Sequence, residues 1–219
     1  MTTFEDVVSR LAVAQTRLLK LERLLDDMEG ICRVKAHLQS LKLTSAALKT
    51  APSDYYAWSL AQRADYLGCN IPHLCKSIIV ENVANPQSGV EDPLNSRYYC
   101  VVLQYNSKLD AEQLRRFVRN RIPEACRPAK KKINFQHASA KASQELTGFA
   151  HNGVSPFGMK TPIPVIVAGA VTKLRPSFIW LGGGAENVKI RICWQDLVKA
   201  LEAPVADGIT ILREDMIKA

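Results

Sequence analysis

The chain has 219 residues, of which 47% are apolar and 23% charged, and its formal net charge is +8 at neutral pH. This composition allows a buried core and excludes a compositionally disordered chain. The longest apolar run, residues 164–171, is too short to span a bilayer, and the residues after Met1 lack the apolar stretch of a secretory signal. We therefore expect a cytoplasmic protein of one ordinary domain with an appendage and no membrane partner.

Cysteine and histidine do not show the spacings of a metal site. None of the six cysteines forms a Cys-x-x-Cys pair, and the four histidines lack zinc-ligand spacing with one another or with cysteine. The sequence also lacks a P-loop, a Gly-x-Ser-x-Gly elbow and a dinucleotide-binding fingerprint. We expect reduced thiols and no metal, and nothing in the spacing favours a Cys–His nucleophile pair.

Residues 3–29 predict one long helix that ends before Gly30. Its apolar residues alternate four and three apart, at Val7, Leu11, Ala14, Leu18, Leu21, Leu25, Met28 and Cys32. This 3.5-residue period is typical of a coiled coil. Two interpretations are open: the helix folds back on its own domain, or it pairs with another chain. A second amphipathic helix is expected at residues 31–42.

The middle of the chain mixes strands and helices. The patterns predict a strand at 45–49, a helix at 58–67 capped by Gly68, and strands at 76–80 and 98–105. A helix opens at Asp110 and runs to about residue 121, before a strand at 133–137 and a helix at 140–146.

The C-terminal part predicts strands at 165–168, 177–181 and 188–192, a helix at 194–201 and a last strand at 209–212 that closes the sheet. In the strand at 188–192, Lys189 and Arg191 alternate with apolar residues, which predicts a half-exposed strand. Strands and helices mix without a strict βαβ order. The sequence therefore predicts an α+β fold with a curved, mixed, barrel-like sheet and surrounding helices.

Positive charge is concentrated between residues 108 and 132. This segment holds nine basic residues and three acidic ones, so it contributes +6 of the net charge of +8. The pattern is consistent with a solvated helix face and a basic loop, or with a site for a phosphate backbone.

The most unusual segment runs from Thr147 to Lys160. It contains three glycines, a proline and Asn152 between a helix and an apolar strand. Because Gly and Asn tolerate positive φ, such a loop can turn several backbone N–H groups toward one point and bind an oxyanion or a carbonyl oxygen. An ordinary tight connection has the same composition. The run Gly182-Gly183-Gly184 is a second place where a ligand, or another part of the chain, can approach the backbone.

Several motifs in this order resemble the YbaK family, the free-standing relatives of the editing domain of bacterial prolyl-tRNA synthetases. They are the stretch 146–160, the strand 164–167, Trp180-Leu181-Gly182-Gly183, Trp194-Gln195-Asp196-Leu197 and the helix–strand passage 67–80. The resemblance covers residues 31 to about 212. It implies a trans-editing aminoacyl-tRNA deacylase that needs no metal or other cofactor.

The family's Gly-x-x-x-Pro loop maps onto residues 152–156, and its strand lysine onto Lys76. The resemblance thus assigns catalysis to Lys76 and to the amides of Gly153, Val154 and Ser155. Substrate binding is assigned to Asn152, Pro156, Gly148, Gly182 and Gly183. The chain departs from the family where Asn152 replaces glycine and at Lys189, where relatives often carry an acidic residue.

In this frame the basic segment is expected to bind acceptor-stem phosphates, through Arg115, Arg116, Arg119, Lys130, Lys131 and Lys132. The expected domains are a coiled-coil helix (1–30), an editing domain (31–212) and a tail (213–219). The expected substrate is mischarged Cys-, Ala- or Ser-tRNA, with tRNA-Pro favoured. The alternative is a non-catalytic tRNA-binding or scaffold subunit of a synthetase complex. Residues 3–29 are expected to join a second copy or a synthetase-complex partner.

Overall fold

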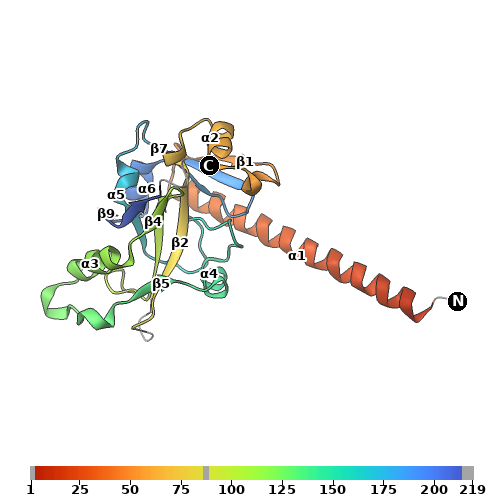
Figure 1. Cartoon of the computed structure of the whole chain (residues 1–219), viewed down its shortest axis with the longest axis horizontal. Coiled ribbons are helices and arrows are strands. Elements are labelled where there is room, and N and C mark those ends of the chain that lie inside the picture. Colours follow the sequence, from red (N-terminus) through yellow and green to blue (C-terminus); the bar gives the residue numbers. More distant parts are fainter. Residues whose placement is uncertain (1–2, 86–88, 214–219) are drawn as a thin grey trace.

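The computed structural model describes residues 3–85 and 89–213, which form an α+β body from which one long helix projects (Figure 1). This helix, α1, spans Phe4–Ser40. Its 37 residues extend over about 55 Å at 1.5 Å per residue. The long N-terminal helix expected from the sequence is therefore present, and most of its length stands clear of the body.

The predicted break of this helix at Gly30 is wrong, because the helix expected at 31–42 is its continuation. Thr3 caps α1 reciprocally: its hydroxyl accepts the Asp6 N–H, and the Asp6 carboxylate accepts the Thr3 N–H. Gly30 is buried within the helix, where an added Cβ would lie 3.2 Å from the carbonyl carbon of Gly184. This glycine therefore permits close packing of α1 on the body and does not end the helix.

Within the described residues, the strands form three sheets, the largest of which is mixed. Its order is β5-β2-β3-β6-β9, with bounds Phe135–His137, Cys75–Asn82, Tyr98–Gln104, Val165–Ala168 and Val205–Ala206. β2 pairs antiparallel with β5 and β3, whereas β3, β6 and β9 run parallel. The central strands β3 and β6 are almost wholly buried, as their continuous apolar sequences require.

The other two sheets are antiparallel. One has the order β1-β8-β7, formed by Ala47–Thr50, Val188–Cys193 and Phe178–Gly182. The other pairs β4 (Ser107–Leu109) with β10 (Thr210–Leu212), so the last strand forms a separate ribbon and does not extend the main sheet. The predicted α+β class with a mixed sheet is confirmed, although the described strands do not close into a barrel.

The described ranges also contain five shorter α-helices: α2 (Leu60–Leu67), α3 (Ala111–Arg121), α4 (Ala140–Thr147), α5 (Gly169–Thr172) and α6 (Trp194–Ala200). Ser59 and Gln62 form a capping box at the start of α2, and Gly68 ends it with a φ of 67°, as predicted. α5, β4 and β9 were not predicted, because segments of two to four residues show no hydrophobic period.

The core has two parts. The larger cluster packs the main sheet against β7, β8 and the C-terminal part of α1, and the smaller one lies beneath α2. All six cysteines are free thiols. The described residues include no group of three side chains suited to a metal ion, and none of the described helices is long and apolar enough to cross a membrane.

Candidate active site

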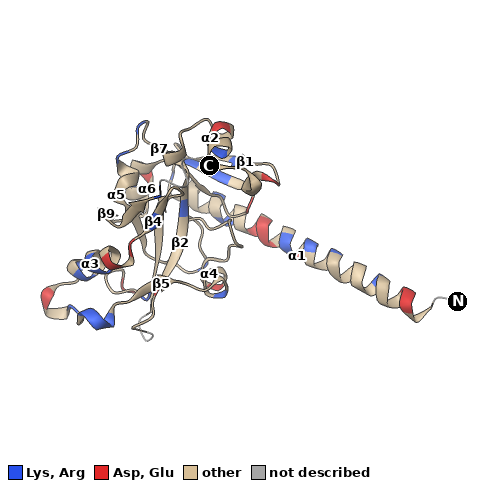
Figure 2. Ribbon diagram, in the orientation of Figure 1, with Lys and Arg blue, Asp and Glu red and all other residues tan. Residues whose placement is uncertain are grey.

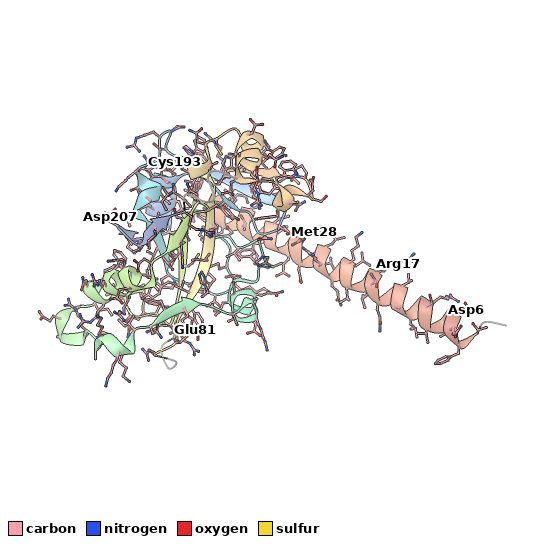
Figure 3. All side chains as sticks on the ribbon, viewed as in Figure 1. Asp6, Arg17, Met28, Glu81, Cys193 and Asp207 are labelled. Carbon is pink, nitrogen blue, oxygen red and sulfur yellow. The ribbon has the colours of Figure 1, made fainter. Side chains whose placement is uncertain are left out.

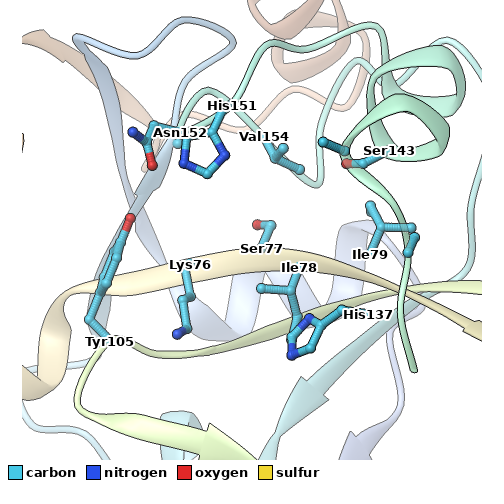
Figure 4. A pocket seen from close by; sticks show the side chains of 13 residues that line it. Lys76, Ser77, Ile78, Ile79, Tyr105, His137, Ser143, His151, Asn152 and Val154 are labelled. Carbon is cyan, nitrogen blue, oxygen red and sulfur yellow. The ribbon is translucent and has the colours of Figure 1, made fainter. Parts of the chain in front are cut away.

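A cavity of about 370 Å³ separates the N-terminal half of β2 from the loop that follows α4 (Figure 4). β2 contributes Lys76, Ser77, Ile78 and Ile79, and the facing loop contributes His151, Asn152 and Val154. Tyr105, His137, Ser143 and Gly182 are also among the lining residues. The cavity thus brings together a strand lysine and a Gly- and Asn-rich loop that are more than seventy residues apart in the chain.

Lys76 is half-buried on β2. Its ammonium group lies 5.6 Å from the centre of the Tyr105 ring, a favourable position for a cation beside an aromatic face. Burial, and next the positive charge of Arg213, lower the pKa of Lys76 from its ordinary value. Lys76 is therefore a partly desolvated cation among the residues that line the cavity.

The loop has the positive-φ turn that the sequence predicts, with Asn152 at φ 65°. Its side chain is held outside the turn, because Asn152 Nδ2 donates to Glu186 Oε1 at 3.1 Å. The next N–H, that of Gly153, donates to the Ala150 carbonyl at 3.0 Å and is already used within the loop. Val154 lines the cavity, and no described residue accepts its N–H.

The remaining predicted loop residues lie away from the cavity lining. Ser155 is fully buried, and its hydroxyl accepts the Phe157 N–H at 3.1 Å. Pro156 borders a different hollow on the other side of the loop, beside His37 and Met159. Gly148 ends α4 with a φ of 69°. Their predicted roles in catalysis or substrate binding stay predictions, and the structure gives Ser155 and Gly148 positions that support the loop.

The glycine run at the end of β7 is approached by the chain itself. Gly182 lines the cavity, and an added Cβ there would lie 3.1 Å from the carbonyl carbon of Val154. Gly183 donates its N–H to Val188 and forms part of the turn to β8. Gly184 has a φ of 95° and lies against Gly30 of α1. These close approaches fix the loop at 153–154 and α1 against the same turn.

The C-terminal third of α1 holds both ends of the loop. Arg33 donates from Nη2 to the Gly148 carbonyl at 2.6 Å and from Nε to the Gly158 carbonyl at 3.1 Å. His37 Nδ1 accepts the Gly158 N–H at 2.9 Å, and burial lowers the pKa of His37. Nothing in the local sequence of α1 indicated these contacts. They argue against treating the helix as a separate appendage, and the division at residue 30 stays a prediction.

Lys189 is buried, so the prediction that it lies on the exposed side of β8 is wrong. It is 4% exposed, and its amine donates to the Tyr56 hydroxyl at 2.7 Å and to the Glu186 carbonyl at 2.8 Å. The Tyr56 hydroxyl in turn donates to the Asn152 carbonyl at 3.0 Å. Burial, and next the charge of Arg63, lower the pKa of Lys189 to about 7. This buried network supports the loop through the Asn152 carbonyl, and the alternation of residues along β8 did not predict it.

The basic segment lies on α3 and on the turns after it, at the side of the body away from α1 (Figure 2). Three of its predicted tRNA contacts share one carboxylate, since Arg115, Arg116 and Lys130 all pair with Glu112. Arg119 donates to the Pro128 carbonyl. Lys131 and Lys132 are exposed and form no ion pair with the described residues. The segment therefore presents a net positive surface, partly neutralised at its centre.

Comparison with known proteins identifies the family of this domain. The model of the aminoacyl-tRNA editing domain family matches residues 57–200, about two thirds of the chain. The chain belongs to the aminoacyl-tRNA editing domain family. The matched region contains Lys76, the loop at 152–156 and Gly182, whereas α1 and Tyr56 lie outside it.

Solved structures share the fold of this editing domain. A candidate trans-editing enzyme for prolyl-tRNA synthetase superposes with a TM-score of 0.63 at 21% identity, over 84% of this chain and 97% of the other. The protein APE2540 gives a TM-score of 0.62 at 21% identity, over 82% of this chain and 99% of the other. At this identity the likeness establishes the fold alone.

Proposed function

We propose that this chain is a trans-editing aminoacyl-tRNA deacylase, which hydrolyses the ester between a wrongly attached amino acid and the 3′ end of a tRNA. The observation that carries the proposal is that Lys76 lines one cavity together with Asn152 and Val154 of the loop. At about 370 Å³, this cavity has the volume of a small-molecule site. Membership of the editing-domain family supports the same activity.

The reaction requires little chemistry from the protein. Water adds to the ester carbonyl carbon, the bond to the ribose oxygen breaks, and the proton lost by water is transferred to that oxygen. The vicinal ribose hydroxyl activates the ester, so the site needs to position the ester and stabilise the negative oxygen of the tetrahedral intermediate.

Within the loop we assign the stabilising N–H to Val154 in the first place, because it lines the cavity and lacks a protein acceptor among the described residues. The Gly153 N–H is bonded to Ala150, and Ser155 is a buried support of the loop. Lys76 then supplies positive charge toward the terminal nucleotide. His151 and His137 line the same cavity and can accept the proton of the attacking water.

We further propose that the substrate is Cys-, Ala- or Ser-tRNA, with tRNA-Pro favoured, and that Lys130, Lys131 and Lys132 bind phosphates of the acceptor stem. Their exposure, and the absence of any ion pair from Lys131 and Lys132 to described residues, suit phosphate contacts that give affinity without sequence discrimination. We place the protein in the cytoplasm, where aminoacylated tRNA is used.

The deciding experiment is a deacylation panel of mischarged tRNAs with the full chain, Lys76→Ala and Lys173→Ala. Lys173 is an exposed lysine outside the cavity lining, which makes it a matched control. We expect turnover of at least one small aminoacyl-tRNA, a loss of about 100-fold or more in Lys76→Ala, and little change in Lys173→Ala. If the chain binds tRNA but hydrolyses none of the substrates, the result would favour the scaffold alternative. The Gly153 N–H, which is already bonded to the Ala150 carbonyl, is the observation that keeps this alternative open.

A further inference from the structure

The part of α1 that projects from the body carries a continuous apolar stripe. This seam consists of Val7, Leu11, Ala14, Leu18, Leu21, Leu25 and Met28, all exposed. Leu18 is 56% exposed, Leu25 65% and Met28 63%. Figure 3 shows the side chains of this projecting segment, with Arg17 and Met28 labelled, standing clear of the body. The interpretation that this helix folds back onto its own domain is therefore not what the structure shows.

The opposite side of α1 is the one that contacts the body. Arg23, Asp27, Gly30 and Val34 follow one another at intervals of four and three residues and therefore share one side of the helix. Arg23 pairs with Glu186 at 2.5 Å, and Val34 is fully buried. Because this side lies roughly half a turn from the seam, the seam faces away from the body along its whole length. A partner helix can thus lie along the seam without displacing the domain.

The charges that flank the seam indicate what that partner is. Arg17 precedes Leu18 and Glu22 follows Leu21, which places them on the two borders of the seam. Neither side chain forms an ion pair with another described residue. In a parallel pair of identical helices, Arg17 of one copy faces Glu22 of the other copy, five places further along the chain.

In an antiparallel pair, each border of the seam faces the same border of the second copy. Arg17 would then face an arginine border that also contains Arg10, and Glu22 would face the border that contains Glu29. Like charges across such an interface are unfavourable. The borders of the seam are therefore complementary to a second copy of the same helix in the parallel orientation.

We propose that residues 7–28 of α1 bind a second copy of this chain as a parallel two-stranded coiled coil. Both bodies lie at the same end of the coiled coil, since in each copy the seam runs from residue 7 toward the body. The proposal rests on the exposed seam and its flanking charges and does not depend on deacylase activity.

The first test is the mass of the full chain in solution, measured by sedimentation equilibrium. We expect a dimer for the wild-type chain. Leu18→Lys places a charge at the centre of the seam in both copies and should raise the dissociation constant by about 100-fold or more. Thr16→Lys adds the same side chain at an exposed position outside the seam and should leave the dimer intact. Thermal unfolding of the body should be unchanged in both variants, which separates loss of pairing from loss of folding.

Two further variants test the orientation. Arg17→Glu should weaken the dimer, and the double change Arg17→Glu with Glu22→Arg should restore it. Leu11→Cys, in a chain whose exposed Cys32 and Cys126 are replaced by serine, should form an interchain disulfide on mild oxidation. A wild-type monomer, a trimer or tetramer, or a dimer that survives Leu18→Lys would overturn the proposal. A dimer without the Leu11→Cys cross-link would refute the parallel orientation.

Discussion

The packing of Gly182 against the site loop gives a sharp test of how the cavity is built. A methyl group at this position would lie 3.1 Å from the carbonyl carbon of Val154 and 3.2 Å from the carbonyl oxygen of Gly153, with the Val154 oxygen closer still. These neighbours are backbone atoms and cannot rotate away. Gly182→Ala must therefore push the loop at 153–154 outward by about 1 Å.

This displacement should cost more in activity than in stability. Overpacking of this kind typically lowers the free energy of unfolding by about 1–3 kcal/mol. A shift of about 1 Å in a group that stabilises the transition state can lower the rate about 100-fold. We expect kcat/KM for deacylation to fall by about that factor, whereas urea denaturation should show that the variant is still folded.

A matched control is Gly169→Ala, which lies outside the cavity lining; the added methyl group would meet the Asp207 side chain, which can rotate, and would lie 3.0 Å from the Asp207 Cα. This variant should keep near-wild-type activity. If Gly182→Ala retained full activity while folded, the position of Val154 would not matter for the reaction, and the assignment of its N–H would be refuted.

Three further predictions concern the surroundings of the site. Arg33→Ala removes the charged donor to two loop carbonyls and should lower the free energy of unfolding by about 2–4 kcal/mol in urea denaturation. Lys20→Ala, on the projecting part of α1, should change it little, and equal losses in the two variants would contradict the role of Arg33 in holding the loop. Burial lowers the pKa of Lys189 to about 7 in the folded state, against 10.5 for an ordinary lysine, so the free energy of unfolding should rise by up to about 1.4 kcal/mol per pH unit between those values. Lys189→Met should lack this rise when urea unfolding is measured against pH. An unchanged slope in the variant would show that the amine is not desolvated. Neutralising Lys130–Lys132 should weaken tRNA binding and reduce its salt slope by about one for each lysine in contact, measured by titration at several salt concentrations, and an unchanged slope would remove these residues from the interface.

Local patterns in the sequence identified the elements with clear periodicity or capping signals. The end of α2 at Gly68, the start of α3 at Asp110 and the positive φ of Asn152 all follow from the preferences of those residue types. The meeting of Lys76 with the loop at 152–154 followed only from the resemblance to a family, since strand pairing between distant segments has no local signal.

The errors have a common physical origin in long-range packing. Gly30 was predicted to end a helix, but its contact with Gly184 makes a glycine necessary within the helix. Lys189 alternates with apolar residues as a solvent-facing residue does, yet Tyr56 and the Glu186 carbonyl provide its buried amine with hydrogen bonds. Gly184 is distant from Gly30 in the chain, and Tyr56 is 133 residues from Lys189, so the sequence around Gly30 or Lys189 does not indicate these contacts.

The most direct test of the account is a crystal structure of the full chain with a 3′-aminoacylamino-adenosine, in which a stable amide replaces the ester. We predict that the amide carbonyl oxygen accepts a hydrogen bond from the Val154 N–H and that the amino acid occupies the cavity beside Lys76. An analogue bound on any other surface, with this cavity empty, would contradict the proposed site.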